Sequence, residues 1–250
     1  LDAMSCYPRT ALAPDTALAG GLARLAKAGA VSVVLALDPL LSPPPQRLAE
    51  AFHLARPFKQ HFVVDRQQGA PSFSRHHRYE IRLARRRCTV REVALTEHLA
   101  DWSALYRGLV ERHGIIGIQC FSEGYFAALA RLPGLCAYAA LIEERIVAMS
   151  LWLRYGERAY SHLAAASEEG YAASASYLLY AAAIEALGAC RWLDLGGTSG
   201  SADDHDSGLA RFKRGFANAG AESWLCGHVL DERGYACLLY TSPSPRDRQK

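Results

Sequence analysis

The sequence CAYAALIEERIVAMSLWLRYGERAYSHLAAA occupies residues 136–166 and decides the fold. It contains three apolar, strand-like runs that are separated by short polar turns. The runs are Cys136–Ile142, Ile146–Tyr155 and Ala159–Ala165, and the turns are Glu143-Glu144-Arg145 and Gly156-Glu157. Connections this short predict three antiparallel strands in hairpin succession.

Helical patterns lie on both sides of these strands. Before them, helices are predicted over 101–112 and from Ser122 to Leu132, with Ser122 as the N-cap of the second. After them, the pattern predicts a long apolar helix, a strand, a short helix and a last strand, over 174–187, 191–195, 209–217 and 222–229. A meander followed by one βαβ crossover predicts an α+β fold, with a mixed, mostly antiparallel sheet flanked by helices.

The first third of the chain alternates between helix and strand. Helices are predicted over 16–28 and 46–55, and strands over 31–37 and 58–64. A polar loop, 67–74, leads to an arginine-rich helical segment over 75–87 and then to a strand, 88–95.

Composition excludes several classes of protein. Half of the 250 residues are hydrophobic and 21% are charged, which is not typical of a disordered chain, a collagen or a polytopic membrane protein. The seven cysteines form no CxxC pair, so neither a zinc site nor a disulfide framework is predicted. The arginine-rich, asparagine-poor composition indicates a bacterial gene, and we expect a cytoplasmic protein without a metal. Because the chain starts at Leu1, we expect a missing N-terminus, and the composition of 238–250 predicts a non-native tail.

Three motifs together resemble the Fem-type branch of the GNAT acyltransferases. They are Tyr160-Ser-His-Leu-Ala-Ala-Ala-Ser167, Leu193-Asp-Leu-Gly-Gly197 and Gly208-Leu-Ala-Arg-Phe-Lys-Arg-Gly-Phe216. The resemblance spans roughly 58–230 and implies two GNAT-like units in tandem, with the first one truncated. We therefore expect a partial unit with its connecting helix over 1–95 and an acyltransferase domain over 96–237. The branch includes aminoacyltransferases of peptidoglycan synthesis, so the resemblance implies a role in the cell envelope.

The resemblance also implies where the acyl carrier binds. In GNAT proteins the pyrophosphate of acetyl-CoA lies at a helix N-terminus, where unpaired amides and the helix dipole favour an anion. The corresponding loop here begins at Ser167-Glu-Glu-Gly, and the expected cofactor-binding residues are Ser167, Gly170, Ala172 and Ser174. Gly170 and Ala172 match the family pattern. Ser167 departs from it, and two adjacent glutamates disfavour a phosphate, so acyl-CoA and aminoacyl-tRNA both stay open as donors.

The candidate catalytic residues are Lys213, His162 and Asp194. The resemblance implies that Lys213 lies in the active site, where its charge would stabilise an oxyanion or a phosphate, with Phe212 and Arg214 beside the substrate. His162, in the middle of a strand, can take a proton from an amine near neutral pH. Asp194, in the next strand, can orient or deprotonate the substrate, or it can cap the loop that follows.

The arginine-rich segment is the other candidate binding surface. Arginines accumulate between residues 75 and 91 against Glu80 alone, at positions 75, 78, 82, 85, 86, 87 and 91. The helical spacing places several on one face, and Arg82 and Arg86 are the predicted substrate contacts. Such a face can bind RNA phosphates, a lipid pyrophosphate or an anionic membrane surface, or it can simply be solvated.

Other interpretations receive less support from the sequence. Asp203-Asp-His-Asp206 contains metal-ligand residue types, but four adjacent residues seldom converge on one ion, and a solvated loop is the expectation. Ser161 and His162 cannot form a nucleophile–base pair because neighbours in a strand point to opposite faces. We expect an amine acceptor, either a small molecule or lipid-linked, and no DNA. The alternative function is a non-catalytic binding module on the same fold.

Overall fold

In a computed structural model of the chain, residues 2–5, 10–197 and 207–241 are described. The chain forms two compact units, Leu1–His61 with Ala221–Lys250 and Phe62–Gly220. This division differs from the boundary predicted near residue 95. The reason is that the arginine-rich helix packs against a helix of the second unit and the following strand pairs within that unit's sheet.

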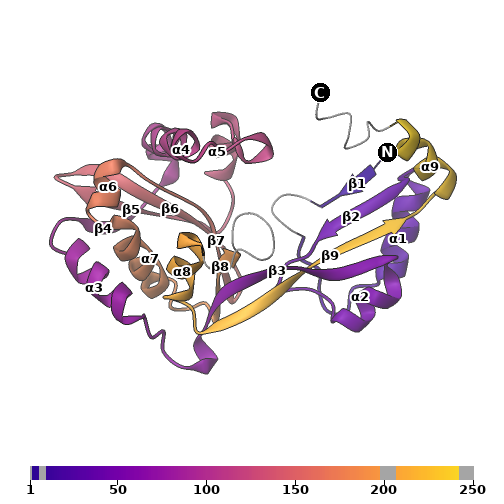
Figure 1. Cartoon of the computed structure of the whole chain (residues 1–250), viewed down its shortest axis with the longest axis horizontal. Helices are drawn as coiled ribbons and strands as arrows, with labels where there is room; N and C mark the ends of the chain where they lie inside the picture. Colours follow the sequence, from indigo (N-terminus) through magenta and orange to yellow (C-terminus); the bar gives the residue numbers. More distant parts are fainter. Residues whose placement is uncertain (1, 6–9, 198–206, 242–250) are drawn as a thin grey trace. The chain divides into compact units, whose positions relative to one another are not determined.

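The first unit combines the N-terminal segment with the last strand of the chain (Figure 1). Its elements are β1(Asp2–Met4), α1(Leu18–Lys27), β2(Ser32–Ala36), α2(Pro45–Ala51), the first part of β3(Leu54–Asp65), most of β9(Ala219–Val229) and α9(Glu232–Thr241). The strand order is β1-β2-β9-β3, with β1 parallel and β9 antiparallel to β2. Leu37, Leu48 and Cys226 are fully buried in its core.

The sequence did not predict β1 or α9. The helix α9 begins at Glu232 and ends at Thr241, so it crosses the predicted start of the tail at residue 238. None of the helices in the described part of the chain is long and apolar enough to cross a membrane.

The second unit has the predicted meander at its centre. Its sheet has the order β3-β8-β7-β6-β5-β4, antiparallel from β4 to β7 and parallel between β7 and β8. The strands are β4(Thr89–Val93), β5(Leu135–Ile142), β6(Arg145–Tyr155), β7(Arg158–Ala166) and β8(Trp192–Gly197). The predicted α+β class is confirmed.

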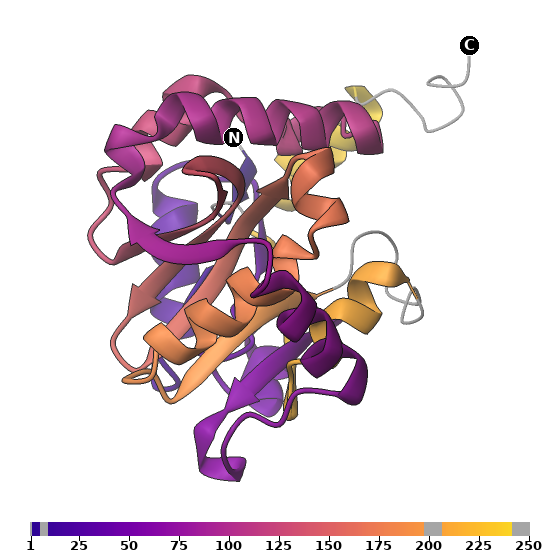
Figure 2. The ribbon, with the colours of Figure 1, turned by 90° about the vertical axis from the view of Figure 1, so that its left-hand side faces the viewer.

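Helices cover both faces of this sheet (Figures 1 and 2). On one face lie α4(Leu99–His113) and α5(Glu123–Leu129), and on the other α3(Arg75–Ala84) and α7(Ala175–Ala186). A short helix, α6(Glu168–Ala172), precedes α7, and α8(Gly208–Arg214) follows β8. Three 3-10 turns, at Arg66–Gln68, Leu95–Glu97 and Gly117–Gln119, complete the described elements.

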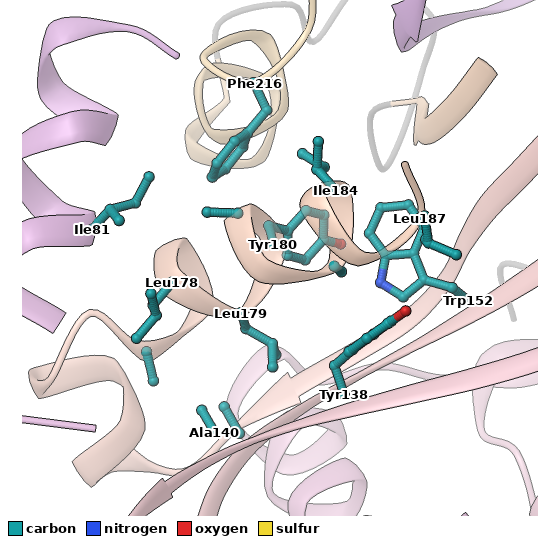
Figure 3. Packing of buried hydrophobic residues seen from close by; sticks show 14 of the residues in the cluster. Ile81, Tyr138, Ala140, Trp152, Leu178, Leu179, Tyr180, Ile184, Leu187 and Phe216 are labelled. Carbon is teal, nitrogen blue, oxygen red and sulfur yellow. The ribbon is translucent and has the colours of Figure 1, made fainter. Parts of the chain in front are cut away.

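Each face of the sheet has its own core. Trp102 of α4 and Met149 and Leu151 of β6 are completely buried between the sheet and the helices α4 and α5. On the opposite face, Tyr180 of α7 packs between Trp152 and Phe216, with Leu179 and Ile184 beside it (Figure 3). Burial of side chains this large contributes roughly 1.5–3 kcal/mol each, so these two layers fix the positions of β7, β8 and α8.

Candidate functional site

Strands β7 and β8 separate after a short parallel ladder. They pair only from Arg158↔Trp192 to Tyr160↔Asp194 among the described residues. Beyond that point β7 continues to Ala166 and stays paired with β6, from Leu151↔Leu163 to Ala148↔Ala166. Within the described residues, β7 and β8 are therefore not paired with each other beyond Tyr160 and Asp194. His162 lies in the part of β7 beyond the last pair, and Asp194 and Lys213 contact the turn that ends β8.

His162 lies at an irregularity in β7. The register with β6 passes from Trp152↔Ser161 to Leu151↔Leu163, so the ladder skips His162 and a β-bulge forms at this position. A bulge changes the direction of a side chain, and bulges are frequent beside active sites. His162 Nε2 is 2.7 Å from the hydroxyl oxygen of Tyr125, whose ring stacks on Phe121 with centroids 4.3 Å apart. Ser161, in contrast, hydrogen-bonds Tyr180 of α7 at 2.8 Å, so the two neighbours contact different faces as predicted.

Asp194 and Lys213 meet at the glycine pair that ends β8. The buried Asp194 carboxylate accepts a hydrogen bond of 2.7 Å from the amide of Gly196. Lys213 Nζ donates to the carbonyl oxygen of Gly197 at 2.6 Å. Gly196 has φ +84°, and a Cβ there would lie 2.9 Å from Lys213 Nζ. This turn thus needs glycine for its backbone and for the approach of the ammonium group.

Helix α8 is held in place by a histidine of α3. His77 Nε2 is 2.7 Å from the carbonyl oxygen of Phe212, which can only accept, so Nε2 carries the hydrogen. Nδ1 is 2.8 Å from Ser74 Oγ, the group that also caps α3. A Cβ at Gly215 would lie 1.9 Å from the His77 ring, so only glycine allows this contact. Burial lowers the pKa of His77, and this keeps the imidazole neutral between its two partners.

The predicted carrier loop instead forms the short helix α6. Ser167 is its N-cap: Oγ accepts from the amide of Gly170 at 3.1 Å and donates to the carbonyl oxygen of Val147 at 3.2 Å. Gly170 is buried, and a Cβ there would lie 2.4 Å from Val147 O. The Ala172 carbonyl accepts a 2.9 Å hydrogen bond from Arg87. Ser174, with φ +57°, donates to Glu80 at 2.5 Å. The four predicted carrier-binding residues therefore all have partners within the chain.

The other predicted contacts are distributed over several surfaces. Phe212 is half-buried between Tyr177 and Tyr180, and Arg214 lies over the ring of Phe62 at 5.8 Å. Arg82 lines a cavity beside α3, whereas Arg86 is exposed after the end of that helix. The segment 203–206 lies outside the described residues.

Two residues of this region were not predicted from the sequence. Tyr125 follows the predicted N-cap Ser122, whose Oγ accepts its amide hydrogen bond at 3.2 Å, so the capping signal could have directed attention to it. His77 sits in a segment noted only for its arginines. Its partner in α8 lies 135 residues further along the chain, and no local pattern indicates that contact.

One family model and several solved structures are similar to this chain. Residues 72–214 match the family model described as an acetyltransferase (GNAT) domain. A search of curated protein sequences found no significant match. Among solved structures, the crystal structure of FemX superposes with TM-score 0.68 and 15% identity, over 89% of this chain and 78% of FemX. The C-terminal domain of a putative lysylphosphatidylglycerol synthetase from Agrobacterium fabrum superposes with TM-score 0.61 and 17% identity, over 91% and 76%. L-PGS from Bacillus licheniformis superposes with TM-score 0.61 and 15% identity, over 88% and 74%.

Proposed function

Because the chain belongs to the family of acetyltransferase (GNAT) domains, we propose that it transfers an acyl or aminoacyl group to an amine. The observation that carries this proposal is the convergence of Lys213 and the buried Asp194 on the turn that ends β8, where β7 and β8 have separated. An ammonium group that is fixed in position can stabilise negative charge developing on a carbonyl oxygen.

In the proposed reaction, the amine nitrogen forms a bond to the acyl carbon and the carbon–heteroatom bond to the carrier breaks. Lys213 stabilises the oxyanion of the tetrahedral intermediate. The proton lost by the amine passes to His162 or Asp194, and the departing thiolate or alkoxide of the carrier takes up a proton. His162, next to the Tyr125 hydroxyl, suits proton transfer through that oxygen, whereas Asp194 suits orientation of the amine.

The first turn of α6 favours aminoacyl-tRNA over acyl-CoA as the donor. The Gly170 amide is bound to Ser167, and Glu168 and Glu169 are exposed in the same turn. Arg145 contacts Glu169 at 3.1 Å, but this exposed pair offsets only one of the two charges. A carboxylate next to a pyrophosphate raises the cost of binding that anion.

The acceptor that we propose is an amine of the bacterial cell envelope, small or lipid-linked, reached from the cytoplasm. The lipid part of this proposal is supported by the fold shared with a protein named as a lysylphosphatidylglycerol synthetase, a name that joins an aminoacyl group to a lipid. Phosphatidylglycerol offers hydroxyl groups and no amine, so the amine acceptor rests on the acetyltransferase (GNAT) family alone. The same α6 observations favour a second candidate, a binding module that has lost its carrier.

The test is a titration of the protein with acetyl-CoA and with bulk aminoacyl-tRNA, followed by transfer of the labelled acyl or aminoacyl group to a panel of primary amines. We expect saturable binding of aminoacyl-tRNA, weak binding of acetyl-CoA, and label on the amine. Saturable binding of neither donor, or binding without transfer to any amine, would favour the binding module.

A further inference from the structure

A cavity of about 650 Å³ lies in the second unit, on the side of α3 where the arginine side chains gather. Its walls come from α3, from α7 and from the segment between β3 and α3. Five of the residues that line it are arginines, and one is acidic. The charged residues are Arg66, Arg75, Arg78, Arg82, Arg85 and Glu185. We call this cavity the arginine groove.

The positive charges of the arginine groove are not neutralised from within. Arg66 donates to the carbonyl oxygens of Cys190 and Ile184, at 3.0 and 2.5 Å, and Arg78 donates to that of Phe73. These partners fix the guanidinium groups but carry no charge. Arg75, Arg82 and Arg85 are exposed and form no ion pair within the described part of the chain. A pocket with this excess of cations attracts anions strongly.

The arginines succeed one another along an axis instead of converging on a point. At a rise of about 1.5 Å per residue, Arg75 and the C-cap residue Arg85 are about 15 Å apart along the axis of α3. The three arginines of α3 that line the groove and Arg85 lie within a sector of about 80° around that axis. A single phosphate is held by donors that surround it. A row of cations fits a chain of repeated anions, such as a phosphodiester backbone.

The apolar part of the arginine groove argues against a bilayer. Proteins that lie on a membrane insert exposed apolar side chains next to their cations. Here Ile81 and Ile184 form the floor and are only 5% and 2% exposed, so they cannot enter a lipid layer. A concave surface with a buried floor and a charged rim instead admits a narrow polyanion.

We infer that the arginine groove binds the phosphodiester backbone of an RNA, at a position separate from the turn that holds Lys213. This inference rests on the proposed function, since an aminoacyl-tRNA donor brings such a backbone. It also gives α3 two roles. Its arginine face contacts the RNA, and its buried His77 holds the carbonyl of Phe212, the residue before Lys213. Bound RNA and the candidate oxyanion site are thereby attached to one helix.

The experiment measures binding of uncharged bulk tRNA by fluorescence anisotropy at several salt concentrations. The variant is R75Q/R82Q, since neither side chain has a partner within the described residues and its loss should not disturb the fold. We expect the affinity to fall about tenfold or more, and the slope of log K against log salt to become shallower by about 1.4–1.8, which corresponds to two phosphate contacts.

Two control variants separate charge from fold. R107Q/R131Q removes the same charge from the α4 and α5 side and should keep the wild-type affinity within about twofold, as expected for peripheral surface charges. R75K/R82K keeps the charge and should retain most of the binding. Equal affinity and slope for R75Q/R82Q and the wild type would overturn the inference, as would an equal loss in R107Q/R131Q.

Two further arms distinguish the possible failures. Sedimentation with phosphatidylglycerol vesicles should give the same result for wild type and R75Q/R82Q, and a loss confined to vesicle binding would assign the arginine groove to a membrane instead. Lys213→Ala should keep its tRNA affinity. If Lys213→Ala loses transfer while R75Q/R82Q still binds tRNA normally, the proposed function stands and the arginine groove fails. If Lys213→Ala keeps transfer while R75Q/R82Q loses tRNA affinity, the arginine groove stands and Lys213 has no role in the reaction.

Discussion

Strands β7 and β8 share a short parallel ladder, and the loops that follow them use their polar groups differently. After β7, the chain turns into α6, where Ser167 caps the Gly170 amide and Gly170 packs against Val147. After β8, a buried carboxylate and a lysine share the turn at Gly196 and Gly197. The first end resembles an ordinary helix start, whereas the second places a buried carboxylate and a half-buried ammonium group on one turn.

This difference shows that the fold of the family is not enough to make the loop after β7 a phosphate-binding site. Capping of a helix and binding of an anion use the same amides, so a loop that does one does less of the other. A buried carboxylate such as that of Asp194 needs a reason to be there, because desolvation of a charge is costly. We therefore place the chemistry at the end of β8, and each prediction below can break that assignment.

The largest expected effect is on Lys213→Ala. Removal of one group that stabilises an oxyanion lowers turnover by about 100- to 1000-fold. Transfer of labelled acyl groups under saturating donor measures it. Lys27→Ala, at an exposed position of α1, is the matched control and should have wild-type turnover. Unchanged turnover in Lys213→Ala would move the reaction away from the end of β8.

More of the fold than of the candidate site could be predicted from the sequence. Strands β5, β6 and β7 are set by apolar runs with short polar turns between them, such as Glu143 and Glu144, both with positive φ. Their bounds were therefore predicted within a residue. The helix α6 was missed, although Ser167 followed by two glutamates is a capping signal with acidic residues in a first turn. The bulge at His162 was not predictable, since the alanine-rich run that follows has no clear alternation.

Residues that are distant in the sequence account for the rest. Arg66 hydrogen-bonds groups 118 and 124 residues away, so the arginine groove could be foreseen as a basic face but not as a cavity with a wall from α7. The unit boundary has the same origin. Strand β9 pairs with β2, whose Ser32 lies 197 residues before its register partner Val229, and local sequence patterns do not indicate a pairing over that distance.

The second prediction concerns the closed end of β7, by which we mean the start of α6, where Ser167 caps the Gly170 amide. In Gly170→Ala, the new methyl group meets the backbone carbonyl of Val147, which cannot move without disturbing β6. We expect a loss of about 1–3 kcal/mol in the free energy of unfolding, measured in urea, as for overpacking of a core. Turnover per folded molecule should stay normal. Gly108→Ala in α4, with no neighbour within 4 Å, should be neutral or slightly stabilising.

A smaller effect is expected for Ser167→Ala. Loss of an N-cap hydroxyl costs about 1 kcal/mol, and Ser122→Ala, which uncaps α5 in the same way, should cost a similar amount. The free energy of unfolding measures both. Donor affinity is the discriminating readout: if the Kd for acetyl-CoA or aminoacyl-tRNA rises in Ser167→Ala but not in Ser122→Ala, the hydroxyl binds the donor and the closed end of β7 is a carrier site after all.

The smallest expected effect is a dependence of stability on pH that arises from His77. This residue holds α8, whose Lys213 contacts the turn that ends β8. Burial lowers the pKa of His77 below its ordinary value of 6.5, so the unfolded chain binds the proton more readily than the folded one. The stability that neutral His77 contributes is therefore present above pH 6.5 and is lost as the pH falls below it, toward the lowered pKa.

Urea unfolding at about pH 7.5 and about pH 5.5 tests this dependence. The free energy of unfolding should fall more at the acid pH for the wild type than for His77→Gln, whose amide can still donate to Phe212 O but does not titrate. His113→Gln, at the exposed end of α4, should keep the wild-type difference between the two pH values. An acid loss of the same size in His77→Gln would show that another group titrates in this range, and that α8 does not depend on a neutral imidazole.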